Sequence, residues 1–187
     1  CYVNQKKASD AGIIIWETGY QFQMNETNST VAIGSYGTYT PDEMILSTLA
    51  DHWLKKVENS HLIGYPHSWV PTGENGRFDW QTFNLKTCWD IDLGMPAHNP
   101  DAPWVIFDGN DPVGNPARVY CREFENGLVL VRRRGSNTEG CFSNGAVTVK
   151  LPFGNFKQVT TANSALSGST VTSASIRNGQ GLVFVRV

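Results

Sequence analysis

The run Gly12–Trp16 constrains the fold of this chain most strongly, because it places three isoleucines in a row. β-branched residues favour strands, and a strand whose apolar residues do not alternate with polar ones is buried on both faces. Glu17 follows directly, where such a strand would leave the core. In α/β proteins, functional side chains gather at the carboxyl ends of parallel strands, so Glu17 is a candidate catalytic residue. The alternative interpretation is a surface glutamate that opens a loop.

A long loop is predicted over residues 18–39, which are rich in Asn, Thr, Gly and Tyr. Loops longer than about 15 residues without regular structure are usually functional or mobile. Tyr20 is one of several aromatic residues that make this segment unusual for a plain connection. Two sequons begin at Asn25 and Asn28, and we expect part of the loop to face solvent as a glycosylated segment.

A helix is predicted to begin after Thr40, which is followed by a proline at the first helical position. Glu43 stands three residues after Thr40 and completes a capping box. The apolar residues that follow recur at helical spacing and form one face: Ile45, Leu46, Leu49, Ala50, Trp53, Leu54 and Val57. His52 stands among polar neighbours, and we interpret it as part of the solvated face and not as a ligand.

Residues 61–65 form a second apolar run, which Pro66 ends. Strand, helix and strand in this order predict one βαβ unit with parallel strands and a right-handed crossover. His67 and Trp69 follow the second strand, as Glu17 follows the first. Because parallel strands end at the same edge of a sheet, Trp16, Glu17, His67 and Trp69 are expected to share one cleft.

The composition changes near residue 92. The segment 92–103 holds three prolines and no periodicity, so it is predicted to be a linker. Beyond it the pattern is strand and turn alone, and Asn126-Gly127 joins two β-rich runs in a strong hairpin signal. An antiparallel β-sandwich is the expected fold of this tail. Its predicted strands are 117–124, 128–132, 146–151, 169–176 and 182–187, with another turn at Asn178-Gly179.

Charge and length exclude several classes of protein. The formal net charge of the 187 residues is -2, which gives no sign of a nucleic-acid partner. No apolar run approaches the roughly 20 residues of a membrane-spanning helix. The triplet Arg132–Arg134 is interpreted as the solvated rim of a strand, with an anion-binding patch as the alternative.

The chain has four cysteines and no C-x-x-C pair, so neither a metal site nor a thioredoxin-like site is expected. Cys121 and Cys141 are near in sequence within one predicted domain, and we expect them to form a disulfide worth roughly 3 kcal/mol. Cys1 and Cys88 would then pair by elimination, but Cys1 could equally bond to a segment outside this sequence. An even cysteine number together with the sequons indicates a secreted, extracellular protein.

Three phrases of the chain resemble glycoside hydrolases built from a (β/α) barrel and a C-terminal β-sandwich. They are Glu58–Tyr65, Asp92–Pro96 and Tyr120–Val131. Such families have an N-S-Y-F-G-Y strand, an L-G-x-P linker and an R-x-F-x-N-G-x-V-L-V-N hairpin that opens the sandwich. Relatives often continue with Asn-Pro after the hairpin, whereas this chain has Arg132-Arg133.

The resemblance implies an α/β portion followed by an all-β portion. Residues 1–91 would be the C-terminal part of a (β/α)8 barrel, 92–103 the linker and 104–187 the β-sandwich. By order of elements, Glu17 would end the seventh strand as the nucleophile of a retaining glycosidase, and the acid/base would precede residue 1. The residues expected to bind sugar are Trp16, Tyr20, His67, Trp69 and Trp80. No cofactor is implied.

A full barrel needs about 250 residues, far more than the segment before the linker offers. We therefore expect an N-terminal barrel portion on a separate chain or in a segment outside this sequence. The chain is expected to be a secreted glycoside hydrolase, or its C-terminal chain or fragment, acting on a polysaccharide or glycan. The alternative is a non-catalytic structural or glycan-binding glycoprotein with a degenerate hydrolase fold. A serine hydrolase is disfavoured, since no G-x-S-x-G occurs.

Overall fold

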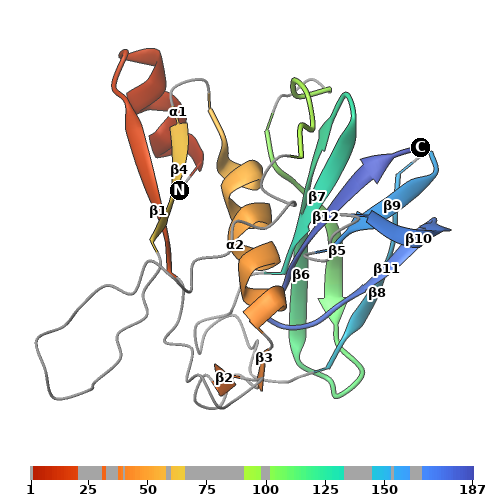
Figure 1. Cartoon of the computed structure of the whole chain (residues 1–187). Helices are drawn as coiled ribbons and strands as arrows, with labels where there is room; N and C mark the ends of the chain where they lie inside the picture. Colours follow the sequence, from red (N-terminus) through yellow and green to blue (C-terminus); the bar gives the residue numbers. More distant parts are fainter. Residues whose placement is uncertain are drawn as a thin grey trace, which may run out of the picture.

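The structure is a computed structural model that describes residues 2–20, 31–32, 38–39, 41–57, 60–65, 91–97, 102–132, 145–152, 154–160 and 166–187. Figure 1 shows two helices and a parallel strand pair on one side of a larger antiparallel sheet. The elements of the first part are α1 (Tyr2–Asp10), β1 (Ile15–Tyr20), β2 (Val31–Ala32), β3 (Thr38–Tyr39), α2 (Pro41–Lys55) and β4 (Ser60–Tyr65). Those of the second part are β5 (Trp104–Asn110), β6 (Pro116–Phe124), β7 (Gly127–Val131), β8 (Val147–Lys150), β9 (Phe156–Val159), β10 (Leu166–Val171), β11 (Ser173–Ile176) and β12 (Gly181–Arg186).

The predicted βαβ order is confirmed by the pairing of β1 with β4. The two strands are parallel and in register from Ile15 opposite Ser60 to Tyr20 opposite Tyr65, with α2 between them in sequence. The short strands β2 and β3 pair antiparallel within the segment predicted as a loop. The first part of the chain is therefore an α/β arrangement, as its sequence pattern indicates.

The start of β1 differs from the prediction. β1 begins at Ile15, whereas Ile13 and Ile14 are 56% and 58% exposed and precede it. The cause is helix α1, which the sequence pattern did not predict. Gly12 follows this helix with a positive φ of 74°, and its N–H donates a hydrogen bond to Ser9 O at 2.8 Å. Glycine in this conformation commonly caps the carboxyl end of a helix. The two exposed isoleucines then connect the helix to the strand.

The second part is a two-layer β structure, as predicted. Six strands form one sheet in the order β10-β9-β12-β7-β6-β5, and β11 and β8 form a second, two-stranded sheet. The predicted hairpin is confirmed, because β6 and β7 are antiparallel and Phe124 pairs with Gly127 across the turn. Buried apolar side chains of both sheets fill the space between them, among them Val119, Leu130, Val149, Phe156, Ile176 and Phe184.

The segment predicted as one strand over 169–176 is two strands in different sheets. β10 ends at Val171 in the six-stranded sheet, and β11 begins at Ser173 in the two-stranded sheet. At the break, Thr172 O accepts a hydrogen bond from Leu151 N at 2.9 Å. The sequence has continuous strand propensity here, so only the packing of the two layers determines where the chain crosses between them.

Helix α2 covers the opposite face of the six-stranded sheet (Figure 1). Its predicted apolar face is confirmed for five residues, whose side chains are buried with sheet residues in a second core. Val57 is half-buried, and the side chain of Ile45 lies outside the described ones. The helix contributes Leu46, Leu49, Ala50, Trp53 and Leu54, and the sheet contributes Phe124, Val129, Val131, Val159 and Val183. The described chain therefore has three layers, with the six-stranded sheet in the middle.

Polar contacts attach both ends of α2 to this sheet. At the carboxyl end, Arg122 Nη1 donates to the oxygens of Trp53, Leu54 and Lys56 at 3.2, 3.3 and 2.5 Å. A cation is favourable there, because the last carbonyls of a helix lack partners and carry the negative end of its dipole. Near the other end, Gly181 N donates to Ser47 Oγ at 2.9 Å.

Glu43 and Gly181 explain the close approach of the amino-terminal half of α2. Glu43 Oε1 accepts hydrogen bonds from Arg177 Nη2 and from Gln180 Nε2, on the turn between β11 and β12. A Cβ atom at Gly181 would lie 2.7 Å from Ala50 Cβ and 2.8 Å from Ser47 Cα. Glycine is therefore required where β12 passes under the helix.

The predicted linker is docked in its described first part, residues 91–97. Leu93 is fully buried in the core beneath α2, and Leu93 O accepts a hydrogen bond from Asn126 N at 2.9 Å. Met95 O accepts from Glu125 N, and Ala97 N donates to Glu123 O. The segment thus runs along the β6–β7 hairpin, which the sequence did not indicate because backbone pairing needs no sequence periodicity.

Two polar residues interpreted as solvated are buried. Arg132 is 0% exposed, pairs with the equally buried Asp111 (Nη2 to Oδ2, 3.2 Å) and donates to Gly145 O. A buried charge is tolerated only when it is paired and hydrogen-bonded, as here. His52 is 7% exposed, and α2 contacts α1 and β1 in addition to the six-stranded sheet.

Within the described residues, neither helix is long and apolar enough to cross a membrane.

Candidate functional site

The carboxyl ends of β1 and β4 form the first candidate site, because the predicted catalytic residue lies on β1. Both strands end at the same level, where Tyr20 is opposite Tyr65. Glu17 is opposite Leu62 and lies inside β1, not after its last residue as the sequence predicted. β1 continues past Glu17, because its parallel pairing with β4 runs as far as Tyr20. Trp16, Glu17 and Tyr20 are thus brought onto one strand beside β4.

Most of the remaining predicted site residues fall in segments that the structure does not describe. Trp16 has a described backbone position, opposite His61 of β4. The other predicted sugar-binding residues and the sequons lie outside the described residues: His67, Trp69, Trp80, Asn25 and Asn28. Of the predicted site, the structure therefore describes only backbone positions on β1, beside β4.

The predicted Cys121–Cys141 disulfide is not formed in the structure. Cys121 is a free cysteine, 0% exposed, in the core between the two sheets. Burial raises the pKa of the Cys121 thiol well above its ordinary value, and the charge of Glu123 acts in the same direction. Because the thiolate is the reactive form, this thiol is inert in the folded protein. Cys1, Cys88 and Cys141 lie outside the described residues.

In the described part of the chain, no group of three or more His, Cys, Asp or Glu residues could hold a metal ion.

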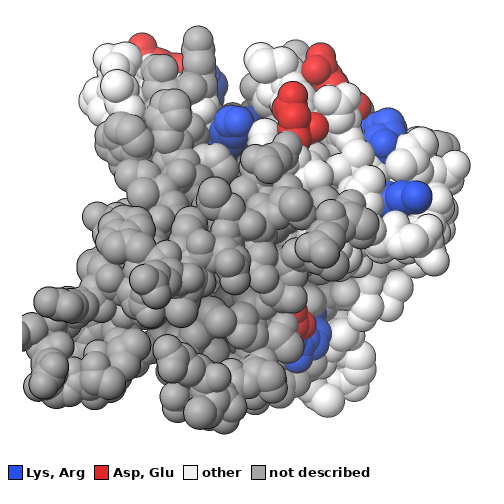
Figure 2. All heavy atoms as spheres, in the orientation of Figure 1, with Lys and Arg blue, Asp and Glu red and all other residues white. Residues whose placement is uncertain are grey.

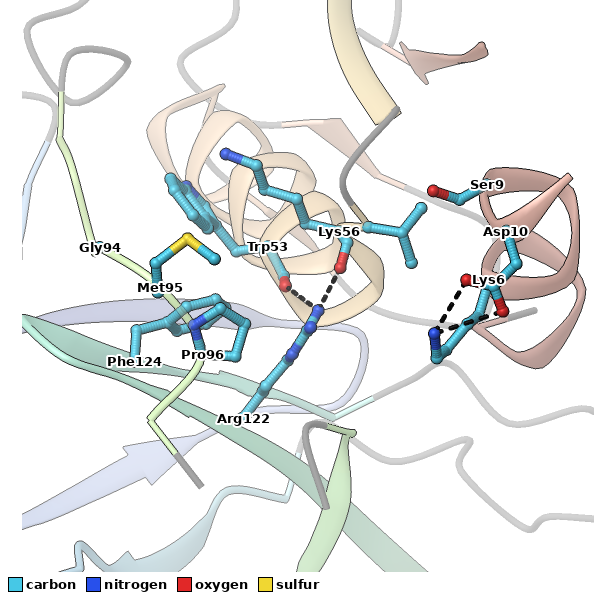
Figure 3. A pocket seen from close by; sticks show the side chains of 11 residues that line it. Lys6, Ser9, Asp10, Trp53, Lys56, Gly94, Met95, Pro96, Arg122 and Phe124 are labelled. Atoms are coloured by element: carbon cyan, nitrogen blue, oxygen red, sulfur yellow. Dashed lines mark hydrogen bonds and ion pairs between the residues drawn. The ribbon is translucent and has the colours of Figure 1, made fainter. Parts of the chain in front are cut away.

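A cavity of about 550 Å³ is the second candidate site, and we call it the α1–α2 cavity (Figure 3). Its volume is typical of small-molecule sites, which measure roughly 300–1,000 Å³. It lies between α1, the carboxyl end of α2 and the segment 94–96, and strand β6 closes it below. Its lining residues are Lys6, Ser9, Asp10, Trp53, Lys56, Val57, Gly94, Met95, Pro96, Arg122 and Phe124.

The wall of the α1–α2 cavity beside the sheet is apolar. Trp53 and Phe124 meet edge to face, with ring centroids 5.2 Å apart and an interplanar angle of 78°. Met95 stands next to them and is 69% exposed, with Pro96 beyond it (Figure 3). Lys56 Nζ lies 4.0 Å from the Trp53 ring centroid, a cation–π contact. The wall thus combines apolar surface with a cation at its border.

The lining charges are mainly positive. The charged residues described in the lining are three cations, Lys6, Lys56 and Arg122, and one carboxylate, Asp10. Asp10 forms an exposed ion pair with Lys6, with Oδ1 3.0 Å from Lys6 Nζ. Burial lowers the pKa of Lys56 from its ordinary value; the Arg122 charge acts in the same direction, and Asp92 opposes it. Figure 2 shows acidic and basic residues interspersed on the described surface of this face. Among the described lining residues, the cations therefore outnumber the carboxylates, and Asp10 and Asp92 offset the charges of Lys6 and Lys56.

The sequence pattern did not indicate the α1–α2 cavity. Helix α1 was not predicted, and Met95 belongs to the segment predicted as a linker. Arg122 belongs to a predicted strand, and nothing in the sequence distinguishes it from other charged strand residues. The buried position of Leu93 is the signal that could have revealed it, because an apolar Leu–Gly–Met–Pro phrase is unusual for a solvated linker.

Comparison of the chain with family models, with curated proteins and with solved structures finds no match.

Proposed function

We propose that this chain is the C-terminal part of a secreted glycoside hydrolase that acts on a polysaccharide or glycan, with Glu17 as its catalytic nucleophile. The observation that carries the proposal is the parallel pairing of β1 and β4 around a helix that is followed by an antiparallel β-sandwich. This order of elements agrees with the three phrases that resemble barrel glycosidases. Glu17 is the only carboxylate on the two paired strands.

The proposed chemistry is retaining hydrolysis. The Glu17 carboxylate attacks the anomeric carbon while a second carboxylic acid protonates the departing oxygen, which gives a glycosyl-enzyme ester. The second residue then acts as a base and activates the water that releases the sugar. The two carboxyl groups must lie about 5–5.5 Å apart. The second carboxyl group would come from an earlier barrel strand.

Open strand edges support a barrel partner. In the described residues the β1–β4 sheet has two strands, so each strand has one edge without a neighbouring strand. Unpaired edges readily accept further strands, and a pair of strands is marginal by itself. We propose that an N-terminal barrel portion, on the same precursor or a separate chain, pairs with these edges and supplies the acid/base.

Aromatic residues near the strand ends suit the proposed substrate. Trp16 and Tyr20 lie on β1, and His67, Trp69 and Trp80 follow β4 in the sequence. Aromatic faces bind the apolar faces of sugar rings, and their polar atoms bind hydroxyl groups. Glycans at Asn25 and Asn28 would agree with the proposed extracellular location.

The decisive experiment traps the intermediate in the full-length secreted protein together with its barrel partner. A panel of 2-deoxy-2-fluoro glycosides is incubated with the protein, and the labelled peptide is identified by mass spectrometry. We expect an ester on Glu17. Glu17→Gln should lower turnover by about 10³-fold or more without a change in the unfolding midpoint, whereas the control Asp108→Asn should leave turnover unchanged. A label on another residue, or an active Glu17→Gln protein, would exclude this role.

A second candidate function is a non-catalytic glycan-binding glycoprotein with a degenerate hydrolase fold. It is favoured by the position of Glu17 inside β1, before the strand end where catalytic residues usually lie. The two functions differ in a simple measurement. A binding protein retains an oligosaccharide without cleaving it, and Glu17→Gln does not alter its affinity, whereas a hydrolase releases reducing ends from the same oligosaccharide.

A further inference from the structure

We propose that Lys56 binds a small aldehyde with an apolar ring in the α1–α2 cavity, through a reversible imine to its side-chain nitrogen. This site is separate from Glu17 and would operate whether or not Glu17 is a nucleophile. Three features of the molecule support it: the amine of Lys56 lines a cavity, its surroundings favour the loss of its proton, and apolar side chains lie beside it (Figure 3).

The Lys56 amine is not held by a carboxylate. The other amine of the lining belongs to Lys6, which pairs with Asp10 at 3.0 Å. Among the described residues, no carboxylate oxygen forms an ion pair with Lys56 Nζ, which lies instead 4.0 Å from the centroid of the Trp53 ring. A ligand can therefore reach this nitrogen without breaking an ion pair within the described part of the chain.

The surroundings of Lys56 favour its neutral form. Burial lowers the pKa of the Lys56 ammonium from its ordinary value, and the charge of Arg122 acts in the same direction. Two groups oppose this shift, since the Asp92 carboxylate and the face of the Trp53 ring both favour a cation. The net direction is downward. Because only the neutral amine is a nucleophile, a partly desolvated lysine of this kind is suited to imine formation.

Apolar side chains beside the amine suit a ring. Trp53 and Phe124 meet edge to face on the side of the cavity next to the sheet, and Met95 and Pro96 line the cavity as well. The Met95 thioether is flexible and polarizable, so it adapts to rings of different shape. The cavity volume of about 550 Å³ admits a compound of one or two rings together with some water. An aromatic or alicyclic aldehyde meets both requirements.

The proposed step is a condensation that releases water. The lone pair of the neutral Lys56 amine attacks the carbonyl carbon, and one proton moves from the nitrogen to the carbonyl oxygen, which gives a carbinolamine. The C–O bond then breaks as the C=N bond forms, and the oxygen leaves as water with the second proton of the amine. Addition of water reverses both steps, so no oxidant, reductant or further reactant is required.

The test compares two lysines within the full chain. The protein is incubated with benzaldehyde and sodium cyanoborohydride, which reduces each imine to a stable benzylamine, and peptide mass spectrometry measures the labelled fraction at each lysine. We expect Lys56 to be labelled about 5-fold faster than Lys7, although Lys56 is half-buried and Lys7 is exposed. In the urea-unfolded chain the two rates should be equal, because the preference comes from the fold.

Matched variants then test the apolar side of the cavity. Met95→Ser removes an exposed apolar side chain and should slow the labelling of Lys56 by benzaldehyde about 3-fold. Its labelling by glyceraldehyde, whose body is polar, should not change. Val113→Ser is the control, since Val113 is similarly exposed, at 66% against 69% for Met95, and does not line the cavity.

The outcomes are distinct. Faster labelling of Lys56 in the folded protein, with a preference for benzaldehyde that depends on Met95, supports the proposal. It is overturned if Lys7 is labelled as fast as Lys56, if the difference persists in urea, or if Met95→Ser and Val113→Ser act alike. None of these measurements involves turnover, so the result is independent of the role of Glu17.

Discussion

Helix α2 meets two sheets, and it meets them differently. Toward the six-stranded sheet it buries Leu49, Trp53 and Leu54 and is held at both ends by polar contacts. It packs against β12 and β7 far more extensively than against β1. The βαβ order in the sequence would assign the apolar face of α2 to its own strand pair, yet that face covers the β-sandwich.

This difference shows which sheet stabilises the helix. Fully burying one large apolar side chain contributes about 1.5–3 kcal/mol, and α2 buries Leu46, Leu49, Ala50, Trp53 and Leu54 on the six-stranded sheet. The helix and the sandwich should therefore unfold as one cooperative unit, to which β1 and β4 are attached. The predictions below test this unit from the largest expected effect to the smallest.

Trp53→Ala should have the largest effect, a loss of about 3–5 kcal/mol in the free energy of unfolding, because the indole is 7% exposed in the core under α2. Trp104→Ala is the matched control, since Trp104 is 40% exposed at the edge of the sheet and should cost less than about 1.5 kcal/mol. Urea unfolding followed by far-UV circular dichroism measures both. Equal losses would show that α2 does not stabilise the sandwich.

Gly181→Ala should cost about 2–3 kcal/mol, because the new methyl group would overlap Ala50 and the backbone of Ser47. Gly168→Ala is the control: a Cβ atom there meets nothing within 4 Å, so the unfolding midpoint should not fall. Hydrogen exchange of the β12 amides sharpens the comparison. It should accelerate in Gly181→Ala and remain unchanged in Gly168→Ala, and the opposite pattern would contradict the close packing of helix and sheet.

Arg122→Gln should have the smallest effect, about 1.5–2 kcal/mol, since it removes a charged donor from the last carbonyls of α2. The loss should appear first as faster hydrogen exchange in the last turn of α2, before β7 or β12 respond. Arg118→Gln is the control, because Arg118 forms an exposed pair with Asp108, and its unfolding curve should superimpose on that of the unchanged chain. No difference between the two variants would mean that the helix end is stable without this arginine.

Local patterns predicted several elements correctly. The periodic segment predicted α2, and Asn126-Gly127 predicted the β6–β7 hairpin, because helical periodicity and turn residues act between near neighbours. The predicted capping box is not confirmed, since Thr40 lies outside the described residues and the Glu43 carboxylate bonds to Arg177 and Gln180. β5 and β9 were not predicted, since their residues do not alternate strictly. For the first candidate site, the pairing of two parallel strands was predicted, but the position of Glu17 relative to the strand end was not.

Cores formed by distant segments could not be read from local patterns. The burial of Arg132 depends on Asp111 and Gly145, and the docking of Leu93 depends on the β6–β7 hairpin. The α1–α2 cavity needs four segments to come together, so no single stretch indicates it.

The sequence by itself therefore determined the order and type of the main elements: a parallel strand pair around α2, followed by antiparallel strands. Periodicity, capping and turn residues act over a few positions and are visible in any sequence. Only the tertiary structure decided which sheet α2 covers, where 169–176 changes sheets, and that Cys121 is a buried free thiol. These features depend on desolvation and shape between distant segments, and burial of a side chain is a property of its neighbours as much as of the residue itself.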